Sequence, residues 1–228
     1  MRLDLEPACK AGDPKLETIT HLLRHRFGRP KSILVIGCGD GTEAAELADR
    51  MEAIVVGVDI VDAFHVSAVD RVELRVADAT ELPFDDGSFD LVFSFHMLEH
   101  VSVPIQALAE MRRVVRPSGG FWVGTPNRSR LVGYVGGRGA SLRDKITWNV
   151  VDWRARLTGR FRNELGAHAG FTQGELRDML RTWFSVVEDE SPAYYALLHQ
   201  RYKPALGLID HSGIGRFIYP SIYFAGRP

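Results

Sequence analysis

The sequence has few cysteines, no long apolar run and no excess of either charge. Its 228 residues include only 2 cysteines, and a chain of this length can bury a core without disulfides or metal, so a disulfide-stapled secreted scaffold is excluded. No uninterrupted apolar stretch reaches the ~18 residues of a membrane span, and acids stand where a signal peptide needs an apolar core. We therefore predict a cytoplasmic protein. With 28 basic and 29 acidic residues, the chain does not resemble a dedicated nucleic-acid binder.

Short apolar runs alternate with helical patterns along the first half of the chain, which is typical of βαβ units and a parallel sheet covered by helices on both faces. We predict seven strands, at residues 32–37, 54–59, 72–76, 89–95, 120–125, 184–188 and 221–225. Helices are predicted at residues 16–27, 42–51, 104–115 and 173–182, the last with a capping box formed by Thr172 and Glu175. The expected fold class is α/β, as a single domain over residues 1–228.

A glycine-rich segment follows the first predicted strand. Gly37, Gly39 and Gly41 lead directly into a helix, so a ligand can approach backbone N–H groups at a helix N-terminus. Asp59 ends the second strand, where a carboxylate can accept both hydroxyls of a ribose. Together these residues predict a site for a nucleoside-containing ligand.

Two residues of this segment bear on the kind of nucleoside. A dinucleotide fingerprint has a third glycine where this chain has Thr42, and Asp40 would place a negative charge beside a pyrophosphate. A cationic ligand without phosphate fits better. An NAD(P)-dependent oxidoreductase remains the alternative enzyme.

Four segments, ILVIGCGDG, VVGVDI, VADATELPFDDGSFDLVFSFHMLEHV and MRRVVRPSGGFWVGTPN, resemble the class I S-adenosylmethionine-dependent methyltransferases of small molecules. The closest pattern is that of the ubiquinone-pathway O-methyltransferases, and the resemblance covers roughly residues 31–127. It implies a Rossmann-like, mostly parallel seven-stranded sheet whose last strand is antiparallel. It also implies S-adenosyl-L-methionine as cofactor and a small-molecule acceptor methylated at oxygen.

The resemblance assigns the cofactor contacts residue by residue. The glycine loop would face the methionine part of the cofactor, and Asp59 would bind the ribose. Asp78 would take the adenine amino group, Ala79 would contact the ring through its backbone, and Ile60 and Phe95 would flank the base.

One position departs from the family pattern. The family usually has an acid two residues before the first glycine, where this chain has Val35. We predict that Asp40 supplies part of the missing contact to the cofactor's ammonium group. A catalytically silent cofactor-binding scaffold is a third hypothesis, and Val35 is the feature that favours it.

Histidines are the candidate catalytic residues, because methyl transfer needs alignment and, for an oxygen acceptor, a base. His168 is the predicted base, since those O-methyltransferases have a histidine in a similar place, and His100 is the second candidate. His96, Glu99 and His100 stand at i, i+3 and i+4 and are expected to share one helical face. That arrangement can hold a divalent metal, but an ordinary helix start is favoured and no metal is predicted.

Residues 126–163 carry nine basic and two acidic side chains, a net +7 that leaves −8 for the rest. We expect this insertion to form a substrate wall. Its arginines either face an anionic acceptor or bind an anionic membrane from which a lipid-like acceptor comes; a solvated surface is the third reading. The helix at 15–27 is predicted to be a lid over the cofactor, with an ordinary packing helix as the alternative.

Overall fold

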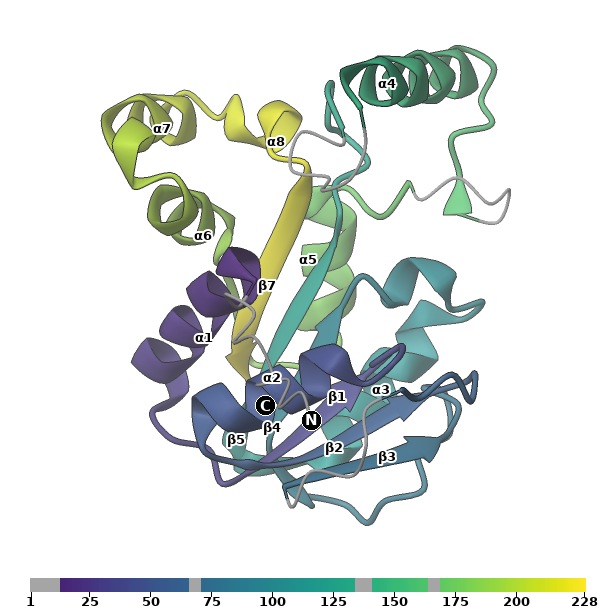
Figure 1. The fold of residues 1–228 in the computed structure, drawn as a ribbon, viewed down its shortest axis with the longest axis vertical. Coiled ribbons are helices and arrows are strands. Elements are labelled where there is room, and N and C mark those ends of the chain that lie inside the picture. Colours follow the sequence, from purple (N-terminus) through teal and green to yellow (C-terminus); the bar gives the residue numbers. More distant parts are fainter. Residues whose placement is uncertain (1–12, 66–70, 134–140, 164–168) are drawn as a thin grey trace, which may run out of the picture.

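The computed structural model describes residues 13–65, 71–133, 141–163 and 169–228 (Figure 1). Seven strands form one sheet in the order β3-β2-β1-β4-β5-β7-β6. Their bounds are β1 Ser32–Ile36, β2 Ile54–Asp59, β3 Val72–Val76, β4 Phe89–Phe95, β5 Val115–Pro126, β6 Val186–Asp189 and β7 Ser221–Arg227. The first five strands run parallel, and β7 runs antiparallel to both β5 and β6. This confirms the predicted Rossmann-like sheet with an antiparallel last strand.

Helices surround the sheet. The α-helices are α1 Pro14–Phe27, α2 Thr42–Met51, α3 Pro104–Val114, α4 Leu142–Leu157, α5 Gln173–Arg181, α6 Ser191–Leu198, α7 Lys203–His211 and α8 Gly215–Ile218, and the 3-10 helices are η1 Leu98–His100 and η3 Gln200–Tyr202. The four predicted helices correspond to α1, α2, α3 and α5, and the capping box of Thr172 and Glu175 is present. The helices α4, α6, α7 and α8 were not predicted.

Two hydrophobic cores lie on the two faces of the sheet. Helices α1, α2 and α6 cover one face, and α3 and α5 cover the other (Figure 1). Alternate residues of β1 enter different cores, because successive side chains of a strand point to opposite faces: Ile33 and Val35 lie in the first core, and Leu34 and Ile36 in the second. A strand buried on both faces is therefore apolar throughout.

Helix α1 packs into the first core through one apolar stripe. Its residues Leu16, Ile19, Leu22 and Leu23 are all buried, and its main helical neighbours are α6 and α2. One face of α1 is thus part of the core, and its predicted role as a lid over the cofactor stays a prediction.

Strand β5 is longer than predicted because it begins with an irregular stretch. Phe89 of β4 pairs with Val115, whereas Leu91 pairs with Gly120, so the intervening residues of β5 bulge out of register. A Cβ at Gly120 would overlap the ring of Phe27, so a larger residue at this position would displace that ring. The packing of α1 against β5 thus depends on this glycine.

Three of the four unpredicted helices lie beyond one end of the sheet. In Figure 1, α4, α7 and α8 lie beyond the end of β5 and the start of β7, at the top of the view. Within residues 13–65, 71–133, 141–163 and 169–228, no helix is long and apolar enough to cross a membrane.

Candidate cofactor and active site

The glycine loop between β1 and α2 takes a left-handed path, with φ of +76° at Gly37, +55° at Gly39 and +87° at Gly41. A Cβ on Gly37 would overlap Met97, and one on Gly41 would overlap Leu74. Gly39 differs, since no described heavy atom lies within 4 Å of the position its Cβ would take. The loop is therefore held tightly at both ends and leaves open backbone in the middle, where a ligand can approach.

Asp59 at the end of β2 is joined to this loop. Its Oδ2 accepts a hydrogen bond from the Gly39 N–H at 2.8 Å, and its Oδ1 accepts one from the Val61 N–H at 3.1 Å. A carboxylate has about four lone-pair sites, so each oxygen retains capacity for a ribose hydroxyl. The carboxylate and the open glycine form the cradle that a nucleoside needs.

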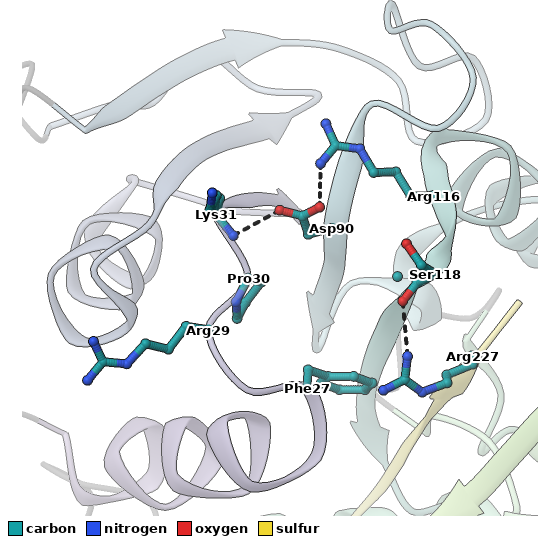
Figure 2. Close-up of a pocket in the computed structure, with 9 residues that line it drawn as sticks. Phe27, Arg29, Pro30, Lys31, Asp90, Arg116, Ser118 and Arg227 are labelled. Atoms are coloured by element: carbon teal, nitrogen blue, oxygen red, sulfur yellow. Dashed lines mark hydrogen bonds and ion pairs between the residues drawn. The ribbon is translucent and has the colours of Figure 1, made fainter.

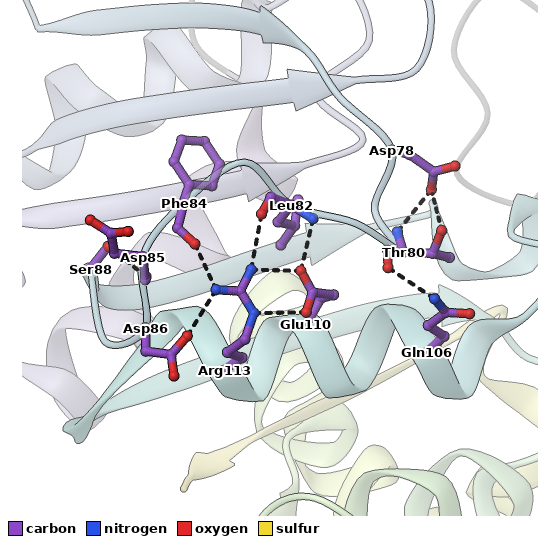
Figure 3. Close-up of polar contacts among 10 residues, drawn as sticks. All are labelled: Asp78, Thr80, Leu82, Phe84, Asp85, Asp86, Ser88, Gln106, Glu110 and Arg113. Carbon is purple, nitrogen blue, oxygen red and sulfur yellow. Dashed lines mark hydrogen bonds and ion pairs between the residues drawn. The ribbon is translucent and has the colours of Figure 1, made fainter.

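Asp78 lies in the segment that follows β3 (Figure 3). One of its oxygens accepts hydrogen bonds from the Thr80 N–H at 2.8 Å and the Thr80 hydroxyl at 2.7 Å. These bonds lower the pKa of the exposed Asp78 carboxyl below its usual range, so the group is ionised at neutral pH. Since Val76 of β3 pairs with Asp59 of β2, the segment starts at the same edge of the sheet as the glycine loop.

Helix α3 holds the segment after β3 in place (Figure 3). Arg113 donates hydrogen bonds to the carbonyl oxygens of Phe84 at 2.6 Å and Leu82 at 2.9 Å. The same guanidinium pairs with Glu110 at 2.7 Å, and Glu110 accepts a hydrogen bond from the Leu82 N–H at 2.8 Å. One arginine thus fixes the loop that carries Asp78.

The remaining cofactor positions lie at the carboxyl edge of the sheet, where ligands of open α/β folds bind. Ile60 is 68% exposed, whereas Ala79 and Phe95 are half-buried. The Phe95 ring lies 4.3 Å from the His96 ring and 6.2 Å from the Tyr223 ring, measured between centroids. The structure brings these positions to one edge, and their contacts with a cofactor stay a prediction.

Asp40 is the charged residue of the glycine loop. Hydrogen bonds from the backbone and side chain of Thr42 lower the pKa of its carboxyl, so Asp40 is an anion at neutral pH. Val35 is buried in the first core. In the same loop, burial, followed by the nearby charge of Asp59, raises the pKa of the Cys38 thiol to about 12, which excludes a thiolate nucleophile there.

The predicted trio after β4 does not share one helical face. His96 takes a left-handed backbone conformation with φ of +53°, and η1 begins only at Leu98. Glu99 therefore points inward with its side chain 1% exposed, while His100 is exposed. Among the described residues, no group of three His, Cys, Asp or Glu side chains is placed to hold a metal. His168, the predicted base, lies outside the described residues.

The inward turn brings Glu99 close to His96. The His96 Nδ1 and a Glu99 carboxylate oxygen are 3.6 Å apart, an electrostatic contact longer than a hydrogen bond. Burial raises the pKa of Glu99 to about 7, against the opposing effects of its own backbone N–H and of Arg130. The residue types were visible in the sequence, but their pairing depends on the left-handed turn.

Several arginines of the basic insertion are structural. Arg130 forms an ion pair with Asp152 at 3.1 Å, with side chains 5% and 13% exposed. Arg128 pairs with Glu175 at 2.9 Å, and Arg156 donates to the Arg128 carbonyl oxygen at 2.5 Å. These contacts attach α4 to the rest of the chain, so the +7 of the insertion overstates the charge available to a substrate.

A cavity of about 430 Å³ lies at the opposite, amino edge of the parallel strands (Figure 2). There Asp90 accepts hydrogen bonds from the N–H groups of Lys31 at 2.9 Å and Ser32 at 3.1 Å, and it also pairs with Arg116. As far as the described residues go, its lining contains none of the predicted cofactor positions. Its polar contacts connect the starts of β1, β4 and β5.

Comparisons with known proteins agree with the fold and with the glycine loop. Residues 34–123 match the family model described as a methyltransferase domain. A protein of Mycolicibacterium smegmatis named as a probable S-adenosylmethionine-dependent methyltransferase is 39% identical over 115 residues, 49% of this chain and 44% of that protein. The 27-O-demethylrifamycin SV methyltransferase of Amycolatopsis mediterranei is 34% identical over 101 residues, 40% of this chain and 37% of that protein.

Among solved structures, a complex of the Haloferax volcanii Trm112 methyltransferase activator with a methyltransferase matches with a TM-score of 0.59 and 17% identity, over 94% of this chain and 90% of that chain. At this identity the match shows the fold alone. The sequence matches identify the segment around residues 34–123 as a methyltransferase domain similar to those of S-adenosylmethionine-dependent methyltransferases, a class whose cofactor is S-adenosylmethionine. The matched segments span less than half the length of the two curated relatives.

Proposed function

We propose that this chain transfers the methyl group of S-adenosylmethionine to an oxygen atom of a small-molecule acceptor. The observation that carries the proposal is the cradle in which the open backbone of Gly39 meets the carboxylate of Asp59. The name of the Amycolatopsis relative, a 27-O-demethylrifamycin SV methyltransferase, supports oxygen as the acceptor atom.

The charges of the site suit this cofactor. When bound, S-adenosylmethionine supplies a methyl group on a positively charged sulfur. The ionised Asp40 in the glycine loop favours such a cation and disfavours the pyrophosphate of NAD(P). The protein's part in an in-line displacement is to hold the acceptor oxygen against the methyl group, exclude water and take up the acceptor's proton.

Calorimetric titration tests the cofactor. We expect wild-type protein to bind S-adenosylhomocysteine and not NAD or NADP. Asp59→Ala removes charge-assisted hydrogen bonds to the ribose and is expected to weaken binding roughly 10- to 100-fold. The matched control Asp62→Ala removes an exposed carboxylate three residues after the end of β2 and should change affinity by less than about twofold. Binding of a nicotinamide cofactor alone would overturn the proposal.

A transfer assay separates an enzyme from a silent scaffold. Purified protein is incubated with methyl-labelled S-adenosylmethionine and a panel of hydroxylated acceptors, and labelled product is measured by mass spectrometry. Transfer to an oxygen atom supports the proposal, and transfer only to nitrogen or carbon contradicts its finer part. Cofactor binding without transfer to any acceptor favours the scaffold.

The exposed surface of α4 bears on the acceptor. None of the 16 residues of α4, all of them described, is buried, and five apolar side chains at helical spacing are 46–89% exposed: Leu142, Ile146, Val150, Trp153 and Leu157. Arg143 and Arg154 are exposed beside them. We propose that this apolar stripe contacts an anionic membrane and that the acceptor is lipid-soluble, because an acceptor that is merely anionic explains the arginines but not the exposed apolar residues.

A further inference from the structure

The turn after β4 lies directly on the glycine loop. A Cβ on Gly37 would overlap Met97, so Met97 packs against the first glycine of the loop, and His96 is its neighbour in the chain. The His96 N–H donates a hydrogen bond to the Gly124 carbonyl oxygen at 2.8 Å, which ties the turn to the end of β5. His96 thus stands at the carboxyl edge, beside the expected position of the cofactor.

The backbone of His96 is held in an unfavourable conformation. Its φ of +53° is in the left-handed region, which a non-glycine residue adopts at an energetic cost and which is found preferentially at functional sites. Only one other described non-glycine residue, Glu52, has a positive φ, and Glu52 is the C-cap of α2, where this conformation is common. No helix end explains the conformation of His96.

The two ring nitrogens of His96 have different neighbours. Nδ1 faces the carboxylate of Glu99 at 3.6 Å, and Nε2 lies 3.2 Å from the Ser221 hydroxyl oxygen. The His96 side chain is 38% exposed, whereas that of Glu99 is 1% exposed. Nδ1 therefore faces a buried acid. Nε2 lies near a hydroxyl group, and the His96 ring that carries both nitrogens is itself accessible.

Glu99 is buried without the hydrogen bonds that such a group normally has. Neither of its carboxylate oxygens has a hydrogen-bond partner within the described part of the chain. A buried carboxyl group without partners is costly, and a native exception to full pairing calls for an explanation. His96 faces it at 3.6 Å, and the charge of Arg130 in the basic insertion also acts on it.

We propose that His96 is the proton acceptor for the acceptor's hydroxyl group and that Glu99 is the positioning residue that orients its ring. The inference rests on the proposed function. The acceptor O–H bond gives its proton to Nε2, a lone pair of that oxygen forms the new bond to the methyl carbon, and the electrons of the broken carbon–sulfur bond stay on sulfur. Glu99 accepts from Nδ1–H, which leaves Nε2 unprotonated to receive the proton, and the proton later passes to water.

The histidine tautomer tests the pairing without any acceptor. We expect nitrogen-15 spectra of the full chain at pH 8, with and without S-adenosylhomocysteine, to show His96 protonated at Nδ1. Glu99→Met should shift His96 towards the Nε2–H form, because the carboxylate that favours a proton on Nδ1 is then gone. His96→Asn identifies the signal, and asparagine tolerates the left-handed backbone. An Nε2–H tautomer in the wild-type protein would overturn the role of Glu99.

The rate of transfer tests the proton acceptor, using the hydroxylated acceptor found in the transfer assay. His96→Asn is expected to lower kcat by about 100-fold or more, with the affinity for S-adenosylhomocysteine unchanged within about twofold. Glu99→Met should lower kcat less and leave KM largely unchanged. His211→Asn, which changes an exposed histidine of α7, serves as the matched control and should behave as wild type.

The outcomes distinguish a failure of the proposed methyl transfer from a failure of the role proposed for His96. If the protein fails to bind S-adenosylhomocysteine, the proposed function fails, and the tautomer still reports whether Glu99 orients His96. If cofactor binds and methyl transfer proceeds, but His96→Asn keeps the wild-type kcat, the proposed function stands and His96 is not the proton acceptor. A loss of kcat in His100→Asn but not in His96→Asn would assign that role to the neighbouring histidine instead.

Discussion

Glu99 is a residue whose burial works against stability. Burial raises the pKa of its carboxyl from the usual 4.5 to about 7, although its own backbone N–H and Arg130 oppose the shift. The folded state therefore holds a proton that the unfolded state releases between pH 4.5 and 7. Because the folded state binds more protons in this window, the contribution of Glu99 to stability falls as the pH rises through it.

Replacing this carboxyl with an apolar side chain should stabilise the fold. Glu99→Met is expected to raise the free energy of unfolding by about 1–3 kcal/mol at pH 8. The gain should be smaller at pH 5, where the wild-type carboxyl is mostly protonated in the folded state. Urea denaturation at the two pH values measures the difference, and Glu17→Met, at an exposed position of α1, is the control. A variant less stable than wild type at pH 8 would show that Glu99 has a stabilising partner.

The combination of greater stability and slower transfer is what distinguishes a functional residue from a structural one. A buried group that merely supports the fold loses stability and activity together when it is replaced. At Glu99 the two are expected to move in opposite directions, as for groups retained because the reaction needs them.

At the scale of elements, helix α3 controls the geometry of the loop that carries Asp78. Arg113 binds two carbonyl oxygens of that loop, Glu110 binds one N–H of it, and Gln106 donates a hydrogen bond to the Thr80 carbonyl oxygen at 3.2 Å (Figure 3). None of these three side chains stands at a predicted cofactor position. The effect of α3 on cofactor binding is therefore one of positioning.

Loosening this attachment should weaken cofactor binding from a distance. Arg113→Ala removes the hydrogen bonds to Leu82 and Phe84, and we expect about a 5- to 20-fold weaker affinity for S-adenosylhomocysteine, since the loop must then be ordered on binding. Calorimetric titration measures the affinity, and hydrogen exchange of residues 77–88 measures the loop. Arg112→Ala on the same helix is the control. Unchanged affinity together with faster exchange would show that the loop does not bind the cofactor.

The elements differ in how far they could be predicted. The helix α5 has a capping box and a buried stripe that includes Leu176 and Leu180, so local signals and packing agree. The helix α4 has a capping box of its own, between Ser141 and Asp144, but no buried residue. Exposed apolar residues lie in the stripe described above and also outside it, at Trp148 and Val151. The helix therefore lacks the regular division between an apolar core face and a polar solvent face on which prediction of a helix depends.

At the scale of the whole molecule, the near-neutral net charge conceals a division. The insertion at residues 126–163 is basic, and the ionised carboxylates of the glycine loop and of the segment after β3 lie at the carboxyl edge. Two ion pairs neutralise part of the basic charge: Arg130 with Asp152, and Arg128 with Glu175. What remains on α4 is a surface with both exposed arginines and exposed apolar side chains.

Vesicle sedimentation tests whether that surface binds a membrane. The full chain is expected to sediment with vesicles containing phosphatidylglycerol, less with pure phosphatidylcholine, and less at high salt. Ile146→Ser with Leu157→Ser should reduce binding at least about tenfold, because two exposed apolar side chains no longer enter the interface. Ile54→Ser, at an exposed position at the start of β2, is the control. No binding to anionic vesicles at physiological salt would reject the membrane and leave an anionic acceptor as the explanation for the arginines.

The sequence by itself determined the sheet, four of the helices and the edge at which the predicted cofactor positions lie, because strand periodicity, capping and the glycine spacing are local properties of the chain. Only the tertiary structure decided that Glu99 turns inward and meets His96, and that Arg130 and Arg128 form internal ion pairs. The position of Glu99 depends on a left-handed turn packed against Gly37, and the two arginines pair with residues 22 and 47 positions away in the chain. The spacing of neighbouring residues encodes neither feature. The physical reason is that burial and pairing are properties of three-dimensional packing, which a charge count along the chain cannot contain.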